Sequence, residues 1–331
     1  MKNPAVTGHA EQFKKLSRIV ESGKIPQVFL FHGIPGIGKH LTARWFIRSL
    51  MCTGSPRPCG TCPACMQFRG GTHPDFIEIS CNDKGIIPIG KSDEAGTVRW
   101  LISRLSRSSI KGRYGVIING ADRIPLQGQN ALLKTLEEPP EGAVIVLLSS
   151  NRSLLLPTIL SRSTEFPFKS LKVEEIREIL KSHDMNPPHL DLLAAFSGGS
   201  YELAVMLTEE DNLLAVIAIM RSMLVGLQKG GMLNLEFDVI LKRIGPDNLL
   251  FVLINALRCL LIIKFKNEEL PPLLADLPGA KPEDIQKLIK VLMELQKKLI
   301  LNVNLATMMK SFLYAMEKFP LVDFPDMPVD Y

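Results

Sequence analysis

Residues 33 to 40 have the types and spacing of a phosphate-binding loop. They read Gly-Ile-Pro-Gly-Ile-Gly-Lys-His, which follows the G-x-x-x-x-G-K-[ST] pattern as far as the lysine. Glycines at 33, 36 and 38 let backbone N–H groups surround phosphate oxygens, and Lys39 reaches the β and γ phosphates. We therefore predict a degenerate site for ATP or another nucleotide at Gly33, Gly36, Gly38, Lys39 and His40. A glycine turn without a ligand is the alternative.

His40 stands where the pattern requires the hydroxyl that ligates Mg²⁺, and imidazole is a poor ligand for this hard cation. A second departure follows the apolar run 116–118, where Asn119-Gly120 replaces the expected Asp-Glu pair. Asp122 lies past the strand end, and we expect it to cap or turn the following segment rather than to replace a missing carboxylate. The residues predict phosphate binding with little hydrolysis.

Four of the six cysteines form one cluster, C-x6-C-x2-C-x2-C, at Cys52, Cys59, Cys62 and Cys65. Closely spaced thiolates on tight turns are typical of a tetrahedral structural zinc site, here the module 52–65. Four cysteine ligands leave no open coordination position for catalysis. Disulfides are the alternative, which an intracellular chain disfavours. Cys81 and Cys259 are isolated and are interpreted as small buried hydrophobes.

The elements that must position these residues alternate between strands and helices. A buried-strand run at 28–31 enters the loop and a helical pattern at 41–51 leaves it. Further strands are predicted at 76–79, 116–118, 144–148 and 165–168. Beyond residue 169 the patterns are helical, at 173–183, 190–196, 201–207, 213–227, 249–265, 282–301 and 305–319. The fold class is α/β plus all-α, a parallel sheet covered on both faces and then helices.

Length and composition bound the organisation of the chain. With 331 residues it exceeds one typical domain. We expect a domain with the nucleotide loop at 1–168, a small helical domain at 169–208 and a larger helical domain at 209–331. A stripe at Leu288, Ile289, Leu292, Leu295 and Leu299 could pack against sister subunits, or belong to an ordinary core.

Charge and hydropathy bear on where the protein is located and on which partners it could bind. The start of the chain lacks a signal-peptide pattern, which predicts a cytoplasmic protein. The apolar stretch 249–263 contains Asn255 and Arg258 and is shorter than a bilayer span, so no membrane is expected. The net charge of +5 is compatible with nucleic acid. The basic residues are Arg99, Arg104, Arg107, Lys111 and Arg113. Arg104, Arg107 and Lys111 are expected on one helix face. This face would contact DNA phosphates, or would simply be exposed to solvent.

Several motifs occur in one order: Val6-Thr7-Gly8-His9, the loop, the cysteine cluster, His73-Pro74-Asp75 and the segment 129–140. Together they resemble the bacterial clamp-loader subunits of DNA polymerase III, members of the AAA+ family. The resemblance covers essentially the whole chain, including Asn302-Val303-Asn304. Its most specific part is Asn-Ala-Leu-Leu-Lys-Thr-Leu-Glu-Glu-Pro-Pro, residues 130–140.

The resemblance favours the delta-prime type over the gamma and tau motor subunits. Motor subunits keep a Ser or Thr after the loop lysine, an Asp-Glu pair and a sensor arginine; His40, Asn119-Gly120 and Glu202 stand there in this chain. The resemblance also places a first sensor at Ser149 or Ser150. Arg162, in Ser-Arg-Ser, matches the Ser-Arg-Cys motif whose arginine finger acts on a neighbour's ATP. A surface ion pair is the alternative for Arg162.

What the resemblance implies is a largely ATPase-silent scaffold in a five-subunit ring. The resemblance implies that residues 169–208 are a helical lid and residues 209–331 a helical collar. The expected partners of the scaffold are gamma or tau and delta subunits, through the collar and Arg162. The sliding clamp and primer-template DNA would be reached through the complex at the nucleoid. The chain would carry no polymerase or nuclease site of its own. Two alternatives stay open. One is an active gamma/tau-like ATPase in which His40 or Thr42, with Asp122, compensates; the other is a zinc-stapled DNA-binding module.

Overall fold

The computed structural model describes residues 8–107, 109–110, 112–229, 240 and 243–299. The predicted helix at 305–319 and the residues Val6, Thr7, Lys111 and Asn302-Val303-Asn304 lie outside the described residues. The chain divides into two compact units, Met1–Ser170 and Leu171–Tyr331. This division falls close to the boundary expected after residue 168. The further boundary expected at 208 stays a prediction.

The first unit contains a five-stranded sheet in which every pair is parallel. Its strands are β1 Val28–His32, β2 Phe76–Ser80, β3 Tyr114–Asn119, β4 Ala143–Ser149 and β5 Thr164–Pro167. They lie in the order β2-β3-β4-β1-β5, and each corresponds to a predicted strand. The carboxyl ends of β1, β3 and β4 therefore lie at one edge of the sheet, where ligands of parallel α/β sheets bind.

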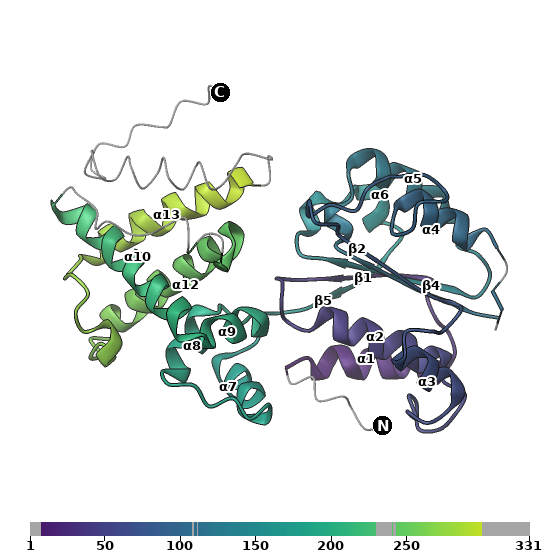
Figure 1. The fold of residues 1–331 in the computed structure, drawn as a ribbon, viewed down its shortest axis with the longest axis horizontal. Coiled ribbons are helices and arrows are strands. Elements are labelled where there is room, and N and C mark those ends of the chain that lie inside the picture. Colours follow the sequence, from purple (N-terminus) through teal and green to yellow (C-terminus); the bar gives the residue numbers. More distant parts are fainter. Residues whose placement is uncertain (1–7, 108, 111, 230–239, 241–242, 300–331) are drawn as a thin grey trace. The chain divides into compact units, whose positions relative to one another are not determined.

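Helices cover both faces of this sheet (Figure 1). One face carries α1 Ala10–Ser22, α2 Lys39–Met51 and α3 Pro63–Arg69; the other carries α4 Val98–Leu105, α5 Leu126–Glu137 and α6 Pro157–Leu160, with short 3-10 turns η1 Ala121–Arg123 and η2 Arg152–Leu154. Alternate residues of each strand enter different clusters, so Phe29 and Phe31 pack with Phe46 of α2 while Leu30 joins the opposite cluster. Burial on both faces explains the nearly continuous apolar runs.

The second unit is helical throughout its described part. Its elements are α7 Val173–Ser182, α8 Leu190–Phe196, α9 Tyr201–Thr208, α10 Glu210–Lys229, α12 Pro246–Phe265, η3 Pro272–Leu274 and α13 Pro282–Leu299. Leu288, Ile289, Leu292 and Leu295 are buried in this unit's own core. The ordinary-core interpretation therefore holds for these four residues, because α12 covers them. Packing of this helical bundle against sister subunits stays a prediction.

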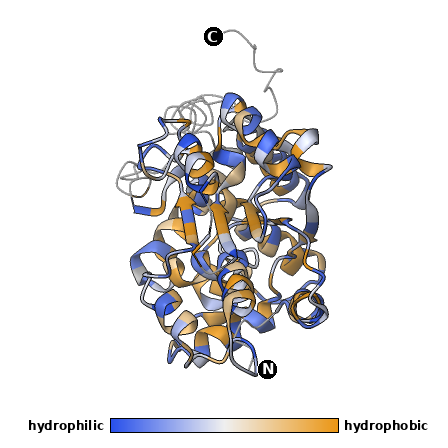
Figure 2. Ribbon diagram, turned by 90° about the vertical axis from the view of Figure 1, so that its right-hand side faces the viewer, coloured by the Kyte–Doolittle hydropathy of each residue, from blue (hydrophilic) through white to orange (hydrophobic). Residues whose placement is uncertain are grey.

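By length and composition alone, α12 is long and apolar enough to cross a bilayer. The core helix of a globular unit passes the same test. Here Leu250, Leu253 and Leu257 of α12 are inaccessible to solvent and belong to the core shared with α8, α10 and α13. The packing favours a core helix. In Figure 2 the helices carry orange and blue residues, and the strands are largely orange, as expected where each helix buries one side.

One expected helix face is not present. Arg104, Arg107 and Lys111 were predicted to share it, but α4 ends at Leu105 with Ser106 as its C-cap. Arg107 lies beyond that cap, where its carbonyl accepts a hydrogen bond from the Tyr114 hydroxyl. A serine-rich stretch, whose side chains compete for backbone hydrogen bonds, follows the helix and favours its end there.

Candidate functional site

The loop at 33–38 leaves β1 and leads directly into α2, as predicted. Gly33 has a φ of +150°, and a Cβ there would lie 2.3 Å from the carbonyl oxygen of Phe168. Only glycine fits so close an approach. Gly38 forms the N-cap of α2 with a φ of +95°. The loop therefore presents the N-terminal end of a 13-residue helix, the backbone setting in which phosphate binds.

Buried side chains brace this loop from within. Lys39 is 8% exposed, and its Nζ donates to the carbonyl oxygens of Gly33 and Ile34 at 2.6 Å each. Nε2 of the buried His9 lies 2.7 Å from the carbonyl oxygen of Ile37. The His9 ring also packs edge-on against Phe168. The lysine that would meet phosphate is thus held on the loop's own carbonyls.

The side chain of His40 contacts β2, the edge strand that β3 and β4 separate from β1. Its Nε2 contacts Oε1 of Glu78 in β2, and Nη1 of Arg44 lies 2.5 Å from Oε2 of the same carboxylate. Arg44 also lies over the rings of Phe68 and Phe76, 5.1 and 5.3 Å from their centroids. The imidazole at the position of the magnesium-binding hydroxyl is therefore in contact with a carboxylate of the protein itself.

The charges around Glu78 determine its ionisation. Burial opposes the charged form, but the hydrogen bond and charge of His40, together with Arg44, outweigh it and lower the pKa of the Glu78 carboxyl. Glu78 stays a carboxylate in contact with His40 and Arg44. Sequence reasoning missed it, although a glutamate among the apolar residues of Phe-Ile-Glu-Ile was a visible signal.

The end of β3 supplies an amide rather than a carboxylate. Asn119 is its last residue, and the buried Asp122 follows in η1. Asp122 accepts backbone hydrogen bonds from Ser150 and Asn151, each at 3.1 Å. We expected Asp122 to cap or turn the segment that follows it in the sequence. Its carboxylate instead binds the backbone of the segment after β4. Both carboxylate oxygens are used there.

Ser149 and Ser150, the two candidates for a first sensor, have different environments. Ser149 ends β4 beside His32 of β1, and its hydroxyl is buried without a hydrogen-bond partner among the described residues. Ser150 is exposed, and its backbone is bound to Asp122. Ser149 therefore places a buried hydroxyl next to the start of the loop, where its carbonyl accepts from the Gly33 N–H.

A cluster of Arg152, Glu165 and His32 was not predicted from the sequence. Arg152 forms two hydrogen bonds of 2.7 Å with the Glu165 carboxylate, and His32 Nε2 lies 3.3 Å from the same carboxylate. The Arg152 hydrogen bond lowers the pKa of Glu165. Burial lowers the pKa of His32, against the attraction of Glu165. These contacts join the ends of β1 and β5.

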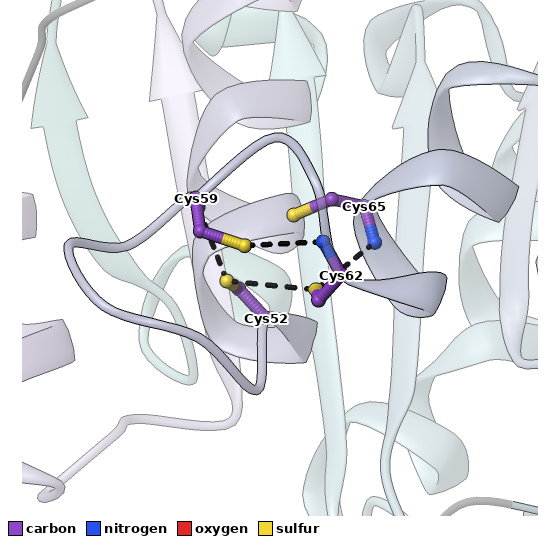
Figure 3. Close-up of side chains that lie close together, drawn as sticks. All are labelled: Cys52, Cys59, Cys62 and Cys65. Carbon is purple, nitrogen blue, oxygen red and sulfur yellow. Dashed lines mark hydrogen bonds between the residues drawn. The ribbon is translucent and has the colours of Figure 1, made fainter.

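The four predicted cysteine ligands come together (Figure 3). Their sulfur atoms all lie within 4.8 Å of one another, and Sγ of Cys52 is 3.9 Å from Sγ of Cys62. Tetrahedral sulfur ligands around zinc lie about 3.8 Å apart. Backbone N–H groups of Cys59, Cys62 and Cys65 point at neighbouring sulfurs at 3.2 to 3.4 Å. The donor set fits a metal ion, and these residues could hold one.

Ionisation differs among the four thiols. Burial raises the pKa of Cys52, and raises that of Cys65 to about 12. At Cys62 burial also opposes ionisation, but N–H groups of Cys65 and Thr53 outweigh it and lower the pKa to about 5. The N–H of Cys62 lowers the pKa of Cys59. The lowered pKa values favour the thiolate at Cys59 and Cys62, burial disfavours it at Cys52 and Cys65, and a bound metal ion would favour it at all four.

Arg162 follows the short helix α6 on the face of the sheet opposite the cysteines. Its Nη2 lies 2.6 Å from Oε1 of Glu137, the last residue of α5. Its Nη1 donates to the Thr158 carbonyl at 2.8 Å and to the Ser161 hydroxyl at 3.2 Å. The guanidinium is partly exposed and held by two elements. Glu137 belongs to the segment 129–140, but no local pattern indicated its contact with Arg162.

Glu202, the residue at the expected sensor position, lies in the second unit. It is exposed in the first turn of α9, where a carboxylate interacts favourably with the helix dipole. Ser200 caps this helix by accepting from the Leu203 N–H at 3.3 Å. The local structure therefore gives Glu202 a stabilising role in its own helix.

Comparison with known proteins gives consistent matches. Residues 8–172 match the family described as DNA polymerase III, delta subunit. The chain is 34% identical over 215 residues to DNA polymerase III subunit tau of Escherichia coli, which is 62% of this chain and 32% of that protein. It is 30% identical over 201 residues to DNA polymerase III subunit delta' of Bacillus subtilis, 60% of this chain and 59% of that one.

The matches cover only part of these relatives. The chain spans about a third of the tau protein's length and somewhat over half of the delta' protein. Among solved structures, a gamma subunit-related protein of DNA polymerase III from Thermotoga maritima aligns with 92% of this chain and 98% of its own, at 20% identity and a TM-score of 0.46. The family match ends at residue 172, close to the end of the first unit.

Proposed function

Because the chain belongs to the clamp-loader subunits of DNA polymerase III, we propose that it is a delta-prime-like subunit that assists loading of the sliding clamp onto primed DNA. In this role it hydrolyses little or no ATP itself and supplies Arg162 to the ATP of a neighbouring motor subunit. The observation that carries the proposal is the contact of His40 with Glu78, because it engages the residue that would have to replace the magnesium-binding hydroxyl.

Other contacts support weak hydrolysis. Asn119 supplies no carboxylate at the end of β3, and both oxygens of Asp122 accept backbone hydrogen bonds. Two groups that could compensate in an active gamma/tau-like ATPase, His40 and Asp122, are thus engaged in other contacts. Phosphate binding at Gly33, Gly36, Gly38 and Lys39 remains part of the proposal, since the loop and the helix start are intact. Bound phosphate would have to take Lys39 from two loop carbonyls.

For Arg162 the argument is chemical. An arginine fork presents fixed N–H donors to the charge that develops on a γ phosphate, and supplying it in trans gives large rate factors. Arg162 has one third of its side chain exposed, so a partner can reach it. A subunit can therefore contribute to hydrolysis in its neighbour while its own loop is silent.

The cysteine site is proposed to hold one zinc ion through Cys52, Cys59, Cys62 and Cys65. Four thiolates complete a tetrahedral shell, so the ion has a structural role. It would join the end of α2, which precedes Cys52, to α3, which Cys62 caps and which contains Cys65. The expected partners are gamma or tau and delta subunits, with the sliding clamp and DNA contacted by the complex in the bacterial cytoplasm.

Reconstitution tests the function. The subunit is combined with the motor subunit, the delta subunit and the clamp encoded by the same genome, and primed DNA is added. DNA-stimulated ATP hydrolysis and clamp loading are then measured. Wild type should support both, and Arg162→Ala should reduce the kcat of hydrolysis by about tenfold or more without preventing assembly. The isolated subunit should show background turnover. Brisk hydrolysis by the subunit alone would instead support the active ATPase.

A further inference from the structure

We propose that Glu137 is the positioning residue of Arg162, so that its carboxylate fixes the guanidinium in the orientation that meets the neighbour's nucleotide. The inference rests on the function proposed above and assigns a role to a residue of the segment 129–140. The evidence is the contact between the last residue of α5 and the residue that follows α6, with Oε1 of Glu137 2.6 Å from Nη2 of Arg162.

Arg162 needs such a partner because its own backbone gives little support. The preceding helix α6 contains four residues, Pro157–Leu160. An arginine on so short an element has many rotamers, and a fork that must meet phosphate oxygens works best when its orientation is already set. In this structure the two terminal nitrogens are anchored on different sides, Nη1 by Thr158 and Ser161 and Nη2 by Glu137.

Glu137 is itself on a well-supported element. Leu132 and Leu136 of α5 are buried in the core. Gln129, also of α5 and 4% exposed, ties down the segment before α6. Its Nε2 donates to the Leu154 carbonyl at 3.0 Å, and its Oε1 accepts from the Leu156 N–H at 2.9 Å. Because these bonds join α5 to the start of α6, the distance between Glu137 and Arg162 is set by the fold.

The arrangement leaves donors for a ligand. Nη1 uses its hydrogens for the Thr158 carbonyl and the Ser161 hydroxyl, and Nη2 uses one for Glu137. Among the contacts of the described residues, none involves Nε of Arg162. A guanidinium has five N–H groups, so Nε–H and the second Nη2–H remain. These can meet two phosphate oxygens while Glu137 still holds the side chain.

The experiment uses the reconstituted complex and four variants of this subunit. They are Glu137→Gln, Glu137→Asp, Glu138→Gln and the double variant Glu137→Gln with Arg162→Ala, and each is compared with wild type and with Arg162→Ala alone. Glu138 is the adjacent glutamate and forms no ion pair among the described residues, so its variant is the matched control. Steady-state ATP hydrolysis is measured over a range of ATP concentrations, with assembly followed by size-exclusion chromatography and subunit unfolding by thermal melting.

Glu137→Gln should lower kcat by about threefold to tenfold with KM for ATP nearly unchanged, since an exposed pair has a modest energy but controls orientation. Glu137→Asp should recover part of the loss, and Glu138→Gln should match wild type. The double variant should be no slower than Arg162→Ala. Assembly and melting should not change. A kcat for Glu137→Gln equal to or above wild type overturns the inference.

Two failures can be told apart. If Arg162→Ala leaves hydrolysis unchanged, the finger itself is wrong, and the inference falls with the proposed function. If Arg162→Ala lowers hydrolysis while Glu137→Gln does not, the proposed function stands and only the positioning role is wrong. A loss in Glu137→Gln that is additive with Arg162→Ala would also overturn the inference, because the carboxylate would then act by another route.

Discussion

His40, in the first turn of α2, contacts Glu78 on β2, a strand that β3 and β4 separate from β1. Helix α2 lies across β3 and β4 as well as β1, and so carries the residue after Lys39 toward the far side of the sheet. The substitution in the loop is therefore matched by a partner elsewhere in the fold. It is more than the loss of a hydroxyl, because a contact between the imidazole and a carboxylate has taken its place.

Restoring the hydroxyl alone should not restore hydrolysis. His40→Thr is expected to leave the isolated subunit at background turnover with saturating Mg-ATP, because Asn119 still provides no carboxylate. The variant should lose about 0.5–1 kcal/mol of folding free energy, a small value because the imidazole is 40% exposed and Arg44 remains on Glu78. Phosphate release and urea denaturation measure the two effects.

The double variant His40→Thr with Asn119→Asp is the sharper control for this prediction. If a carboxylate at the end of β3 is the missing group, only the double variant should gain turnover. A rise of about tenfold or more in His40→Thr alone would contradict the assignment of the defect to both positions.

Acid should weaken the first unit partly through Glu78. Its pKa is lowered in the folded chain, so its contribution to stability is complete above the ordinary glutamate pKa of about 4.3 and is lost as pH falls through the lower folded value. Glu78→Gln should therefore flatten the dependence of unfolding free energy on pH between about 5 and 3. Glu165, whose pKa is lowered by Arg152, gives an independent comparison in Glu165→Gln. Identical slopes for wild type and Glu78→Gln would refute the assignment.

The strands and the loop could be predicted from the sequence because their signals are local. Apolar runs such as 28–31, and glycines with a lysine at fixed spacing, depend only on neighbouring residues. The contacts of Glu78, Asp122 and Glu137 could not be predicted in this way. Each joins segments brought together by the strand order or by a crossover, and Glu78 lies 38 positions after His40 in the sequence. The residue types can be read from the sequence, but which residues they contact depends on the tertiary fold.

The end of α4 shows a different reason for an incorrect expectation. Arg104, Arg107 and Lys111 have helical spacing, but the serines at 106, 108 and 109 favour a helix end over its continuation. The prediction relied on the spacing of the basic residues, whereas the serines determine where the helix ends. The cysteine cluster is the opposite case, since its close spacing alone was enough to bring four sulfurs together.

The purified protein should contain one zinc ion per chain, measured by elemental analysis. Cys62→Ser and Cys65→Ser should lose the metal and melt at lower temperature, because a structural ion contributes folding energy directly. Cys81→Ser, which changes a cysteine outside the cluster, should retain both metal and stability. A strong chelator should reproduce the loss in wild type. Full stability after complete metal removal would show that the four cysteines do not need an ion.

Arg44 should couple the cysteine module to the sheet. Its guanidinium pairs with Glu78 and lies over Phe68 of α3 and Phe76 of β2, whose rings pack 4.4 Å apart between centroids. Arg44→Ala should cost about 1–3 kcal/mol of folding free energy, from a partly buried ion pair and two cation–π contacts. Arg44→Lys should recover only part, because an ammonium lacks the planar surface that covers both rings. Urea denaturation gives the free energies, and equal stability of the lysine variant and wild type would refute the role of the stacked guanidinium.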